Sequence, residues 1–230
     1  MRIAVFGAGG PTGRRLVEQA LLAGHEVTAV TRRPHRYAAQ DGLTVTDADA
    51  TDADAVDAVV AGSDAVLSAL GVPPGRRPVS LYSVSAGHMT AAMARHGVKR
   101  LITVSSSVLD PHWRPSGAFF FNHVLDPYVN RVIARTAHDD MRRMESLIRG
   151  TELDWTFARP SGLFDHPRPT HHVVDENSAD GVFTARADLA AAMLRELTDE
   201  QYVRRALGVV TTEVRPSIPR LIRDAAAKGK

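Results

Sequence analysis

The fold of this chain is decided by the stretch Ile3-Ala4-Val5-Phe6-Gly7-Ala8-Gly9-Gly10-Pro11-Thr12-Gly13. Its apolar start predicts a buried strand, and that strand breaks into a run of glycines. Apolar residues then return at the 3.6-residue spacing of a helix, at Leu16, Val17, Ala20 and Leu21. A strand, a glycine-rich turn and a helix in this order form the unit that holds the pyrophosphate of a dinucleotide.

Gly7, Gly10 and Gly13 have the spacing G-x-x-G-x-x-G, and Gly9 makes a closer pair with Gly7. Glycines let the backbone turn tightly and let a phosphate approach the amides. Pro11 suits the first helical turn, where no backbone donor is needed. A tight turn without a ligand is the alternative, but because a strand and a helix flank it we predict that this turn binds a dinucleotide.

The residues after the second predicted strand, 26–31, indicate which dinucleotide is bound. An acidic residue at this position would bind the ribose hydroxyls of NAD, whereas this chain has Arg32, Arg33 and Arg36. Arginine side chains bind a 2′-phosphate that an acidic residue would repel. A solvated basic loop is the alternative. The spacing from the glycine turn favours NADP over NAD.

The remaining periodicity alternates strands and helices and predicts a Rossmann-type doubly wound parallel sheet, an α/β fold. Strands are expected at 43–46, 64–68, 99–104, 153–160 and 206–211, with a short extended piece at 181–184. Helices are expected around 56–60 with Asp52 as N-cap, at 80–96, around 141–148, from Ala187 or Asp188 to Leu197, and at 216–228. Residues 165–181 are polar and predict a loop. We find no linker or repeat, so residues 1–230 are expected to form a single domain.

Composition excludes several classes of function. The net charge is +2, with no long basic run, so nucleic-acid binding is not expected. There is no cysteine, which excludes disulfides, thiolate nucleophiles and Cys-based zinc sites. No apolar run reaches the length of a membrane span, and no signal pattern precedes the first strand. We therefore expect a cytoplasmic monomer or homodimer that acts on a small molecule.

No metal site is predicted. His171 and His172 are adjacent, and adjacent side chains on an extended chain point in opposite directions. The acidic residues between 47 and 57 lack the spacing of a ligand loop. Asp49 and Ala50 instead follow a strand, where the adenine of a dinucleotide lies. A bond from Asp49 to the adenine amino group and a capped, solvated turn are both compatible with this pattern.

Candidate residues for chemistry gather where later strands end. Ser105 and Ser106 follow the strand at 99–104, and ligands of parallel sheets bind at the carboxyl ends of strands. Leu70 and Gly71 follow the strand at 64–68, where small residues let a ribose approach. The segments near 109–135 and 161–185 are expected to face the substrate. For the aromatic residues of the first segment, a hydrophobic cluster without a substrate role is the alternative.

These motifs resemble those of an atypical short-chain dehydrogenase/reductase, closest to the NAD(P)H-binding group of NmrA-like proteins and flavin reductases of the biliverdin reductase B type. The resemblance covers nearly the whole chain. Its carriers are the three spaced glycines, Thr31-Arg32, Asp49-Ala50, Ser105-Ser106, the segment 153–160, and the later segments 185–190 and 197–202. It implies cofactor contacts at Thr12, Gly13, Arg32, Arg36, Asp49, Ala50, Leu70, Ser105 and Pro160.

One departure from that group's larger superfamily bears on mechanism. Typical short-chain reductases use Tyr-x-x-x-Lys, in which the lysine lowers the tyrosine pKa so that the tyrosine protonates a nascent alkoxide. None of the four tyrosines has a lysine four residues on; these positions hold Asp41, Ala86, Val132 and Ala206. Acceptors whose reduced form is a stabilised anion need this acid less.

Three hypotheses follow. The first is an NADPH-dependent oxidoreductase that passes hydride to a conjugated acceptor such as a flavin or quinone, oriented by Ser105 and Ser106. The second is a reductase or isomerase of a specialised metabolite with a substitute acid, for which His123, Tyr128 and His138 are the candidates. The third is a non-catalytic NADP(H)-binding redox sensor of NmrA-like type.

Overall fold

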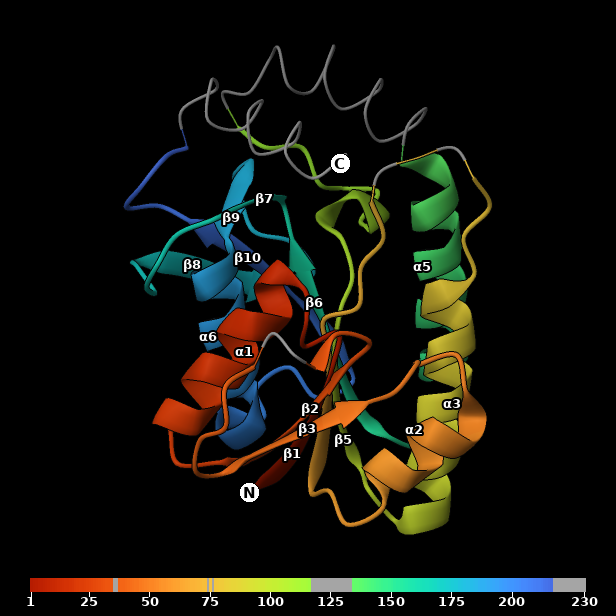
Figure 1. Ribbon diagram of the computed structural model, residues 1–230. Coiled ribbons are helices and arrows are strands. Elements are labelled where there is room, and N and C mark those ends of the chain that lie inside the picture. Colours follow the sequence, from red (N-terminus) through yellow and green to blue (C-terminus); the bar gives the residue numbers. More distant parts are fainter. Residues whose placement is uncertain (35–36, 74, 76, 117–133, 217–230) are drawn as a thin grey trace.

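The computed structural model describes residues 1–34, 37–73, 75, 77–116 and 134–216. Its centre is an eight-stranded sheet with the order β3-β2-β1-β4-β5-β6-β10-β8 (Figure 1). All neighbours pair in parallel except β8, which runs antiparallel to β10. The strand order reverses beside β1, and such a reversal opens a crevice at the carboxyl ends of the strands. The predicted doubly wound fold is confirmed.

The sheet strands are β1 (Arg2–Phe6), β2 (Glu26–Thr31), β3 (Leu43–Asp47), β4 (Ala65–Ser68), β5 (Arg100–Val104), β6 (Asp154–Pro160), β8 (His172–Glu176) and β10 (Arg205–Thr211). A separate parallel pair joins β7 (Gly162–Phe164) to β9 (Phe183–Ala185). Strands β1, β4 and β5 are almost entirely buried. Strands that are buried on both faces consist of continuous apolar runs, and for this reason they could be predicted from the sequence.

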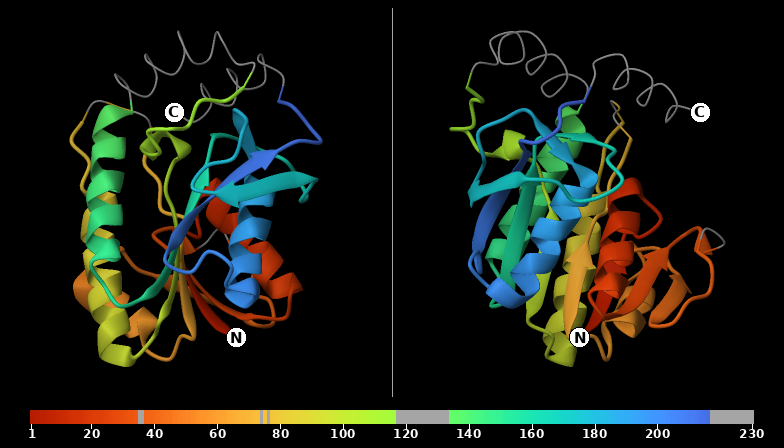
Figure 2. Two further views of the ribbon diagram at one scale, coloured as in Figure 1. Left: turned by 180° about the vertical axis from the view of Figure 1, so that it is seen from behind. Right: turned by 90° about the vertical axis from the view of Figure 1, so that its left-hand side faces the viewer.

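Five described helices cover the two faces of the sheet, as the front and rear views show (Figures 1 and 2). Helices α1 (Pro11–Leu22) and α6 (Arg186–Asp199) pack on one face. Helices α2 (Ala53–Val60), α3 (Leu81–His96) and α5 (Arg135–Arg149) pack on the other. The side chains of successive strand residues point to opposite faces of the sheet and pack in two separate hydrophobic cores. Val5 packs in one core and Phe6 in the other.

Local capping explains where several helices begin and end. The predicted N-cap of α2 is confirmed, because the Asp52 carboxylate accepts hydrogen bonds from the amides of Asp54 and Ala55. Helix α3 ends at Gly97, which has the left-handed conformation that favours glycine. Helix α6 begins at Arg186, one to two residues before the predicted start.

The prediction of a continuous loop over 165–181 is wrong. Residues His172–Glu176 form β8, an edge strand in which Val174 pairs with Val209 of β10. None of its five residues is fully buried. An exposed edge strand needs no apolar run, so hydrophobic patterning does not reveal it. The helix expected at 216–228 lies outside the described residues except for its first position.

Among the described residues no helix is long and apolar enough to cross a membrane.

Candidate functional site

The glycine turn between β1 and α1 is shaped by close backbone contacts. Gly7 has φ +76°, and a Cβ at this position would lie 2.6 Å from the Ala69 carbonyl oxygen. A Cβ at Gly13 would overlap the Gly7 carbonyl. The turn therefore packs directly against the end of β4 and against the first turn of α1, which leaves room only for glycine at these two positions.

Helix α1 begins without a side-chain cap. Gly10 is its N-cap and has no side chain to accept from the helix amides, and Pro11 occupies the first helical turn. No acidic residue lies in that turn, while Thr12 and Gly13 are buried. An uncapped helix start offers amide donors and a partial positive charge to an anion. The five predicted turn residues therefore build a site whose chemistry fits a pyrophosphate.

The end of β2 places arginine side chains beside this turn. Thr31 is buried and its hydroxyl accepts a hydrogen bond from the Arg33 amide at 3.1 Å. The Arg32 side chain is 76% exposed and its guanidinium lies 3.7 Å from a carboxylate oxygen of Asp49, which follows β3. The structure thus brings Arg32 and Asp49 together. Arg36 lies outside the described residues.

The two carboxylate oxygens of Asp49 have different partners. One accepts from both the amide and the hydroxyl of Thr51, at 2.9 and 2.8 Å, and the other faces Arg32. The bonds from Thr51 hold the pKa of Asp49 below its ordinary value, and the Arg32 charge adds to the effect. The carboxylate is therefore ionised at neutral pH, with one oxygen available beside the buried Ala50.

The loop after β4 is held from two sides. The Ala69 amide donates to the Phe6 carbonyl at 2.9 Å, which ties the loop to β1. From the other side, the Tyr82 hydroxyl accepts from the Val72 amide at 3.2 Å. The predicted cofactor contacts Leu70 and Gly71 lie between these two ties, next to the glycine turn.

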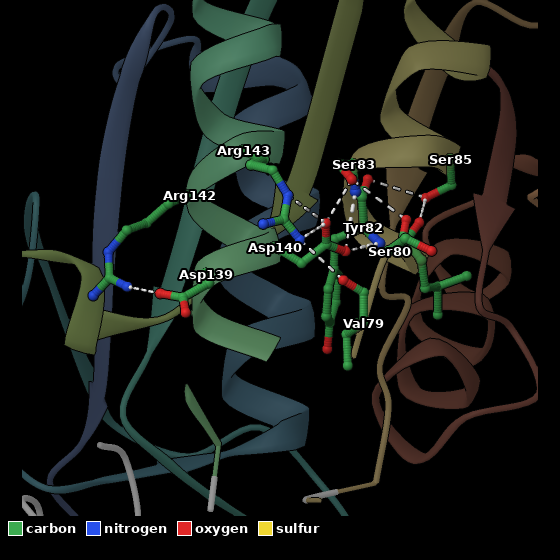
Figure 3. A network of polar contacts seen from close by, with 10 residues as sticks. Val79, Ser80, Tyr82, Ser83, Ser85, Asp139, Asp140, Arg142 and Arg143 are labelled. Carbon is green, nitrogen blue, oxygen red and sulfur yellow. Dashed lines mark hydrogen bonds and ion pairs between the residues drawn. The ribbon is translucent and has the colours of Figure 1, made fainter. Parts of the chain in front are cut away.

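A carboxylate on α5 fixes the start of α3, which carries Tyr82 (Figure 3). Asp140 is fully buried and accepts hydrogen bonds from the amides of Tyr82 and Ser83, at 2.8 and 3.3 Å. Arg143 bonds both Asp140 and the Val79 carbonyl, each at 3.0 Å. Because α3 makes no side-chain cap of its own, Asp140 supplies the cap from the neighbouring helix.

Ser105 ends β5 in a buried polar cluster. Its hydroxyl lies 2.7 Å from Glu145 of α5, and Arg159 of β6 binds both oxygens of the same carboxylate, at 3.1 and 2.7 Å. Arg149 bonds Glu145 at 3.2 Å and lies over the Trp155 ring. A carboxylate between two guanidinium groups is an acceptor only, so Ser105 donates its proton to Glu145. Its oxygen can still accept a hydrogen bond from a ligand, but the hydroxyl has no second proton to donate.

Ser106 differs from its neighbour. Its side chain is partly exposed, and its oxygen accepts from the Val108 amide at 3.3 Å to cap a short 3-10 turn over Ser107–Leu109. No other bond of its hydroxyl is found within the described residues, so its proton is available to a ligand. Pro160, the remaining predicted contact near these serines, is buried at the end of β6.

His138 is the one candidate substitute acid that the structure describes. It is buried on α5, seven residues before Glu145 on the same helix face. At about 1.5 Å per residue it lies roughly 10 Å along the helix from Glu145. His123 and Tyr128 lie outside the described residues.

Sequence reasoning missed Tyr37. This side chain is partly buried against the core under α1, and its hydroxyl donates to the Ala8 carbonyl of the glycine turn at 2.8 Å. Burial raises the pKa of Tyr37 to about 12, against an opposing effect of the Arg14 charge. A lone tyrosine in a polar loop carries no periodic signal, so only the tertiary contact identifies it.

The two segments expected to face the substrate pack on each other where they are described. Asp110 accepts hydrogen bonds from Ser178 and from the His112 amide. Trp113, expected in a substrate-facing loop, is buried with its indole N–H 3.2 Å from the Ala179 carbonyl. This part of the first segment is a packed cluster. Its remainder, 117–133, lies outside the described residues.

The described part of the chain contains no group of three or more metal-ligating side chains. A polar cavity of about 420 Å³ lies at the amino ends of β1, β2 and β3. This is the edge of the sheet opposite the glycine turn, so it is separate from the site described above.

Comparison with known proteins agrees with this geometry. A family model described as NAD(P)H-binding matches residues 7–200. The uncharacterized protein YwnB of Bacillus subtilis is 25% identical over 225 residues, which span 92% of this chain and 99% of YwnB.

Two solved structures share the fold. A short-chain dehydrogenase/reductase (wide type) from Veillonella parvula, in complex with NADP, superposes with a TM-score of 0.76 at 18% identity, covering 94% of this chain and 99% of that one. ChuY of Escherichia coli O157:H7, described as an anaerobillin reductase, superposes with a TM-score of 0.72 at 22% identity, covering 94% of this chain and 100% of ChuY.

Proposed function

Because the chain belongs to the NAD(P)H-binding family, we propose that it is an NADPH-dependent oxidoreductase that passes hydride to a small conjugated acceptor. Two observations carry the cofactor assignment: the uncapped start of α1, and Arg32, which directly follows the Thr31 that packs on the glycine turn. The first feature fits a pyrophosphate and the second fits a 2′-phosphate. The NADP bound by the Veillonella parvula protein supports the same choice.

Each group in the site has a role in this proposal. The amides of the glycine turn and of α1 bind the pyrophosphate, and Arg32 binds the 2′-phosphate. The Asp49 oxygen that faces Arg32 accepts from the adenine amino group. Ser105 accepts a hydrogen bond from a ribose hydroxyl or a carboxamide N–H, because its own proton is held by Glu145. Ser106 keeps a proton for a ligand oxygen.

A conjugated acceptor is favoured by the lack of a tyrosine–lysine acid. The chain has three lysines: Lys99 lies just before β5, at the amino edge of the sheet, and Lys228 and Lys230 lie outside the described residues. Helix α5 carries Glu145, which accepts a hydrogen bond from Ser105 and so does not replace that acid. Bound NADPH supplies two electrons as hydride, and a flavin, quinone or linear tetrapyrrole collects its proton from water. The chain then contributes binding and orientation.

The test is NADPH consumption by the purified protein with FMN, riboflavin, a panel of quinones and a linear tetrapyrrole. We expect turnover with at least one of them, with one NADPH consumed per two-electron reduction. Tight NADPH binding without turnover on any acceptor would contradict the proposal and support the sensor hypothesis. A cytoplasmic location, a monomeric or dimeric state and the absence of nucleic-acid binding stay predictions.

A further inference from the structure

The segment that holds Arg32 and Arg33 is tied to the glycine turn at both of its ends. At the first end, Thr31 packs so closely on the turn that a Cβ at Gly9 would overlap its hydroxyl. At the far end, Tyr37 donates its hydroxyl proton to the Ala8 carbonyl at 2.8 Å. The two anchor points, Ala8 and Gly9, are adjacent residues of the same turn.

Further contacts make each tie rigid. The Thr31 hydroxyl also accepts from the Arg33 amide, which directs the chain away from β2 at this point. The Tyr37 amide donates to the Pro34 carbonyl at 3.0 Å, which links the tyrosine to the residue that follows the two arginines. Burial raises the pKa of Tyr37 to about 12, so its hydroxyl remains a donor well into the alkaline range.

We propose that Tyr37 is a specificity-determining residue, which sets the preference for NADPH over NADH by holding the arginine segment against the pyrophosphate-binding turn. This inference rests on the proposed function. The physical reason is the cost of ordering. Exposed arginines must lose conformational freedom to bind a phosphate. Part of that freedom is already lost because Thr31 packs on the turn, and Tyr37 bonds both the turn and Pro34.

The proposal predicts an effect on one cofactor and not on the other. NADH lacks the 2′-phosphate, so the position of Arg32 and Arg33 contributes little to its binding. NADPH uses these side chains and depends on their placement. A change that releases the tie without altering the glycine turn should therefore weaken NADPH binding and leave NADH binding nearly constant.

The experiment measures the dissociation constants of NADPH and NADH for the full chain and for Tyr37→Phe, which removes only the hydroxyl. We expect NADPH affinity to fall about five- to tenfold, as the loss of one hydrogen bond allows, with NADH affinity within about twofold of wild type. Tyr202→Phe is the matched control. This buried tyrosine lies far from the turn, beside β10, and its hydroxyl lies 3.5 Å from Gln201.

A second variant protects the test against misfolding. Thr31→Val conserves the packing on Gly9 and removes the hydroxyl that accepts from the Arg33 amide, so it should also lower the NADPH preference. If Arg32→Gln costs less NADPH affinity in the Tyr37→Phe background than in wild type, the tyrosine acts through the arginine segment. Equal losses for both cofactors, or no loss in either variant, would overturn the inference. A wild type that shows no NADPH preference would instead overturn the proposed function.

Discussion

The Ser105 hydroxyl lies 2.7 Å from Glu145 Oε1, and Arg159 binds both oxygens of that carboxylate from the neighbouring strand. This contact connects the end of β5, the helix α5 and the end of β6 in one buried cluster. It also assigns Ser105 a chemical character, that of a hydrogen-bond acceptor toward any ligand, because its proton is already donated. Proton donation, where the reaction needs it, has to come from another group.

Glu145→Gln should strongly destabilise the chain. Both Glu145 and Arg159 are buried, so the substitution leaves the Arg159 guanidinium without its main counter-charge. We expect a loss of about 3 kcal/mol in the free energy of unfolding, measured in urea. Glu152→Gln, an 89% exposed partner of Arg204, is the control and should change stability by less than about 1 kcal/mol. Equal stability of the two variants would contradict the assigned role of Glu145.

Asp140→Asn should lower the free energy of unfolding, whereas Asp139→Asn should leave it almost unchanged. The two aspartates are neighbours on α5, but Asp140 caps α3 from a buried position whereas Asp139 pairs with Arg142 at the surface (Figure 3). We expect about 2 kcal/mol for the first substitution and less than about 0.5 kcal/mol for the second.

NADPH binding gives a second readout of the same pair. Because Tyr82 holds Val72 in the loop that contains the predicted cofactor contacts Leu70 and Gly71, Asp140→Asn should also weaken NADPH binding. Unchanged NADPH affinity in a folded Asp140→Asn protein would limit Asp140 to a structural role.

Two helical glycines should respond in opposite directions to alanine. A Cβ at Gly13 overlaps the Gly7 carbonyl, whereas one at Gly87 in α3 lies 3.8 Å from Leu147, an ordinary contact. Gly13→Ala should therefore cost more than about 2 kcal/mol and abolish cofactor binding. Gly87→Ala should stabilise the protein by up to about 1 kcal/mol through helix propensity. Urea unfolding and a cofactor titration measure both effects, and a Gly13→Ala protein that binds NADPH normally would refute the structure of the turn.

Tyr37 should titrate late in alkaline solution. Because burial raises its pKa to about 12 from an ordinary value near 10, the folded state favours the neutral phenol. Its contribution to stability is therefore fully present below pH 10 and is lost as the pH rises through about 12. The difference between the ultraviolet pH titrations of wild type and Tyr37→Phe should give one tyrosinate with a midpoint near 12. A midpoint near 10 would show that the hydroxyl is exposed.

The strands beside the glycine turn could be predicted because they are buried on both faces. Their apolar runs, such as Ala65–Ser68, mark them without any knowledge of their neighbours. The edge strand β8 could not be found in this way, since pairing with β10 defines it and its side chains remain partly or fully exposed. The same distinction applies to helix starts: Asp52 caps its own helix and was predictable, whereas α3 is capped by Asp140, 58 residues away.

In the candidate site, too, some residues could be predicted from local sequence and others could not. Motif spacing identified the glycine turn, Arg32 and Asp49. The structure places Arg32 beside Asp49 and packs the preceding Thr31 on the turn. Motif spacing did not identify the hydrogen-bonding partners that determine what each of these groups can do. Glu145, which accepts the hydrogen bond of the Ser105 hydroxyl, and Tyr37, which reaches Ala8 across 29 residues, are brought to the site by tertiary packing alone.

We propose that the turn at Gly7–Gly13 and the arginines after β2 form one NADPH site. The most direct measurement is a calorimetric titration of the wild-type protein with NADPH and with NADH at moderate salt. We predict that NADPH binds at least about tenfold more tightly, and that Arg32→Gln removes most of this difference. Equal affinity for the two cofactors, or a preference that persists in Arg32→Gln, would show that these arginines do not bind the 2′-phosphate.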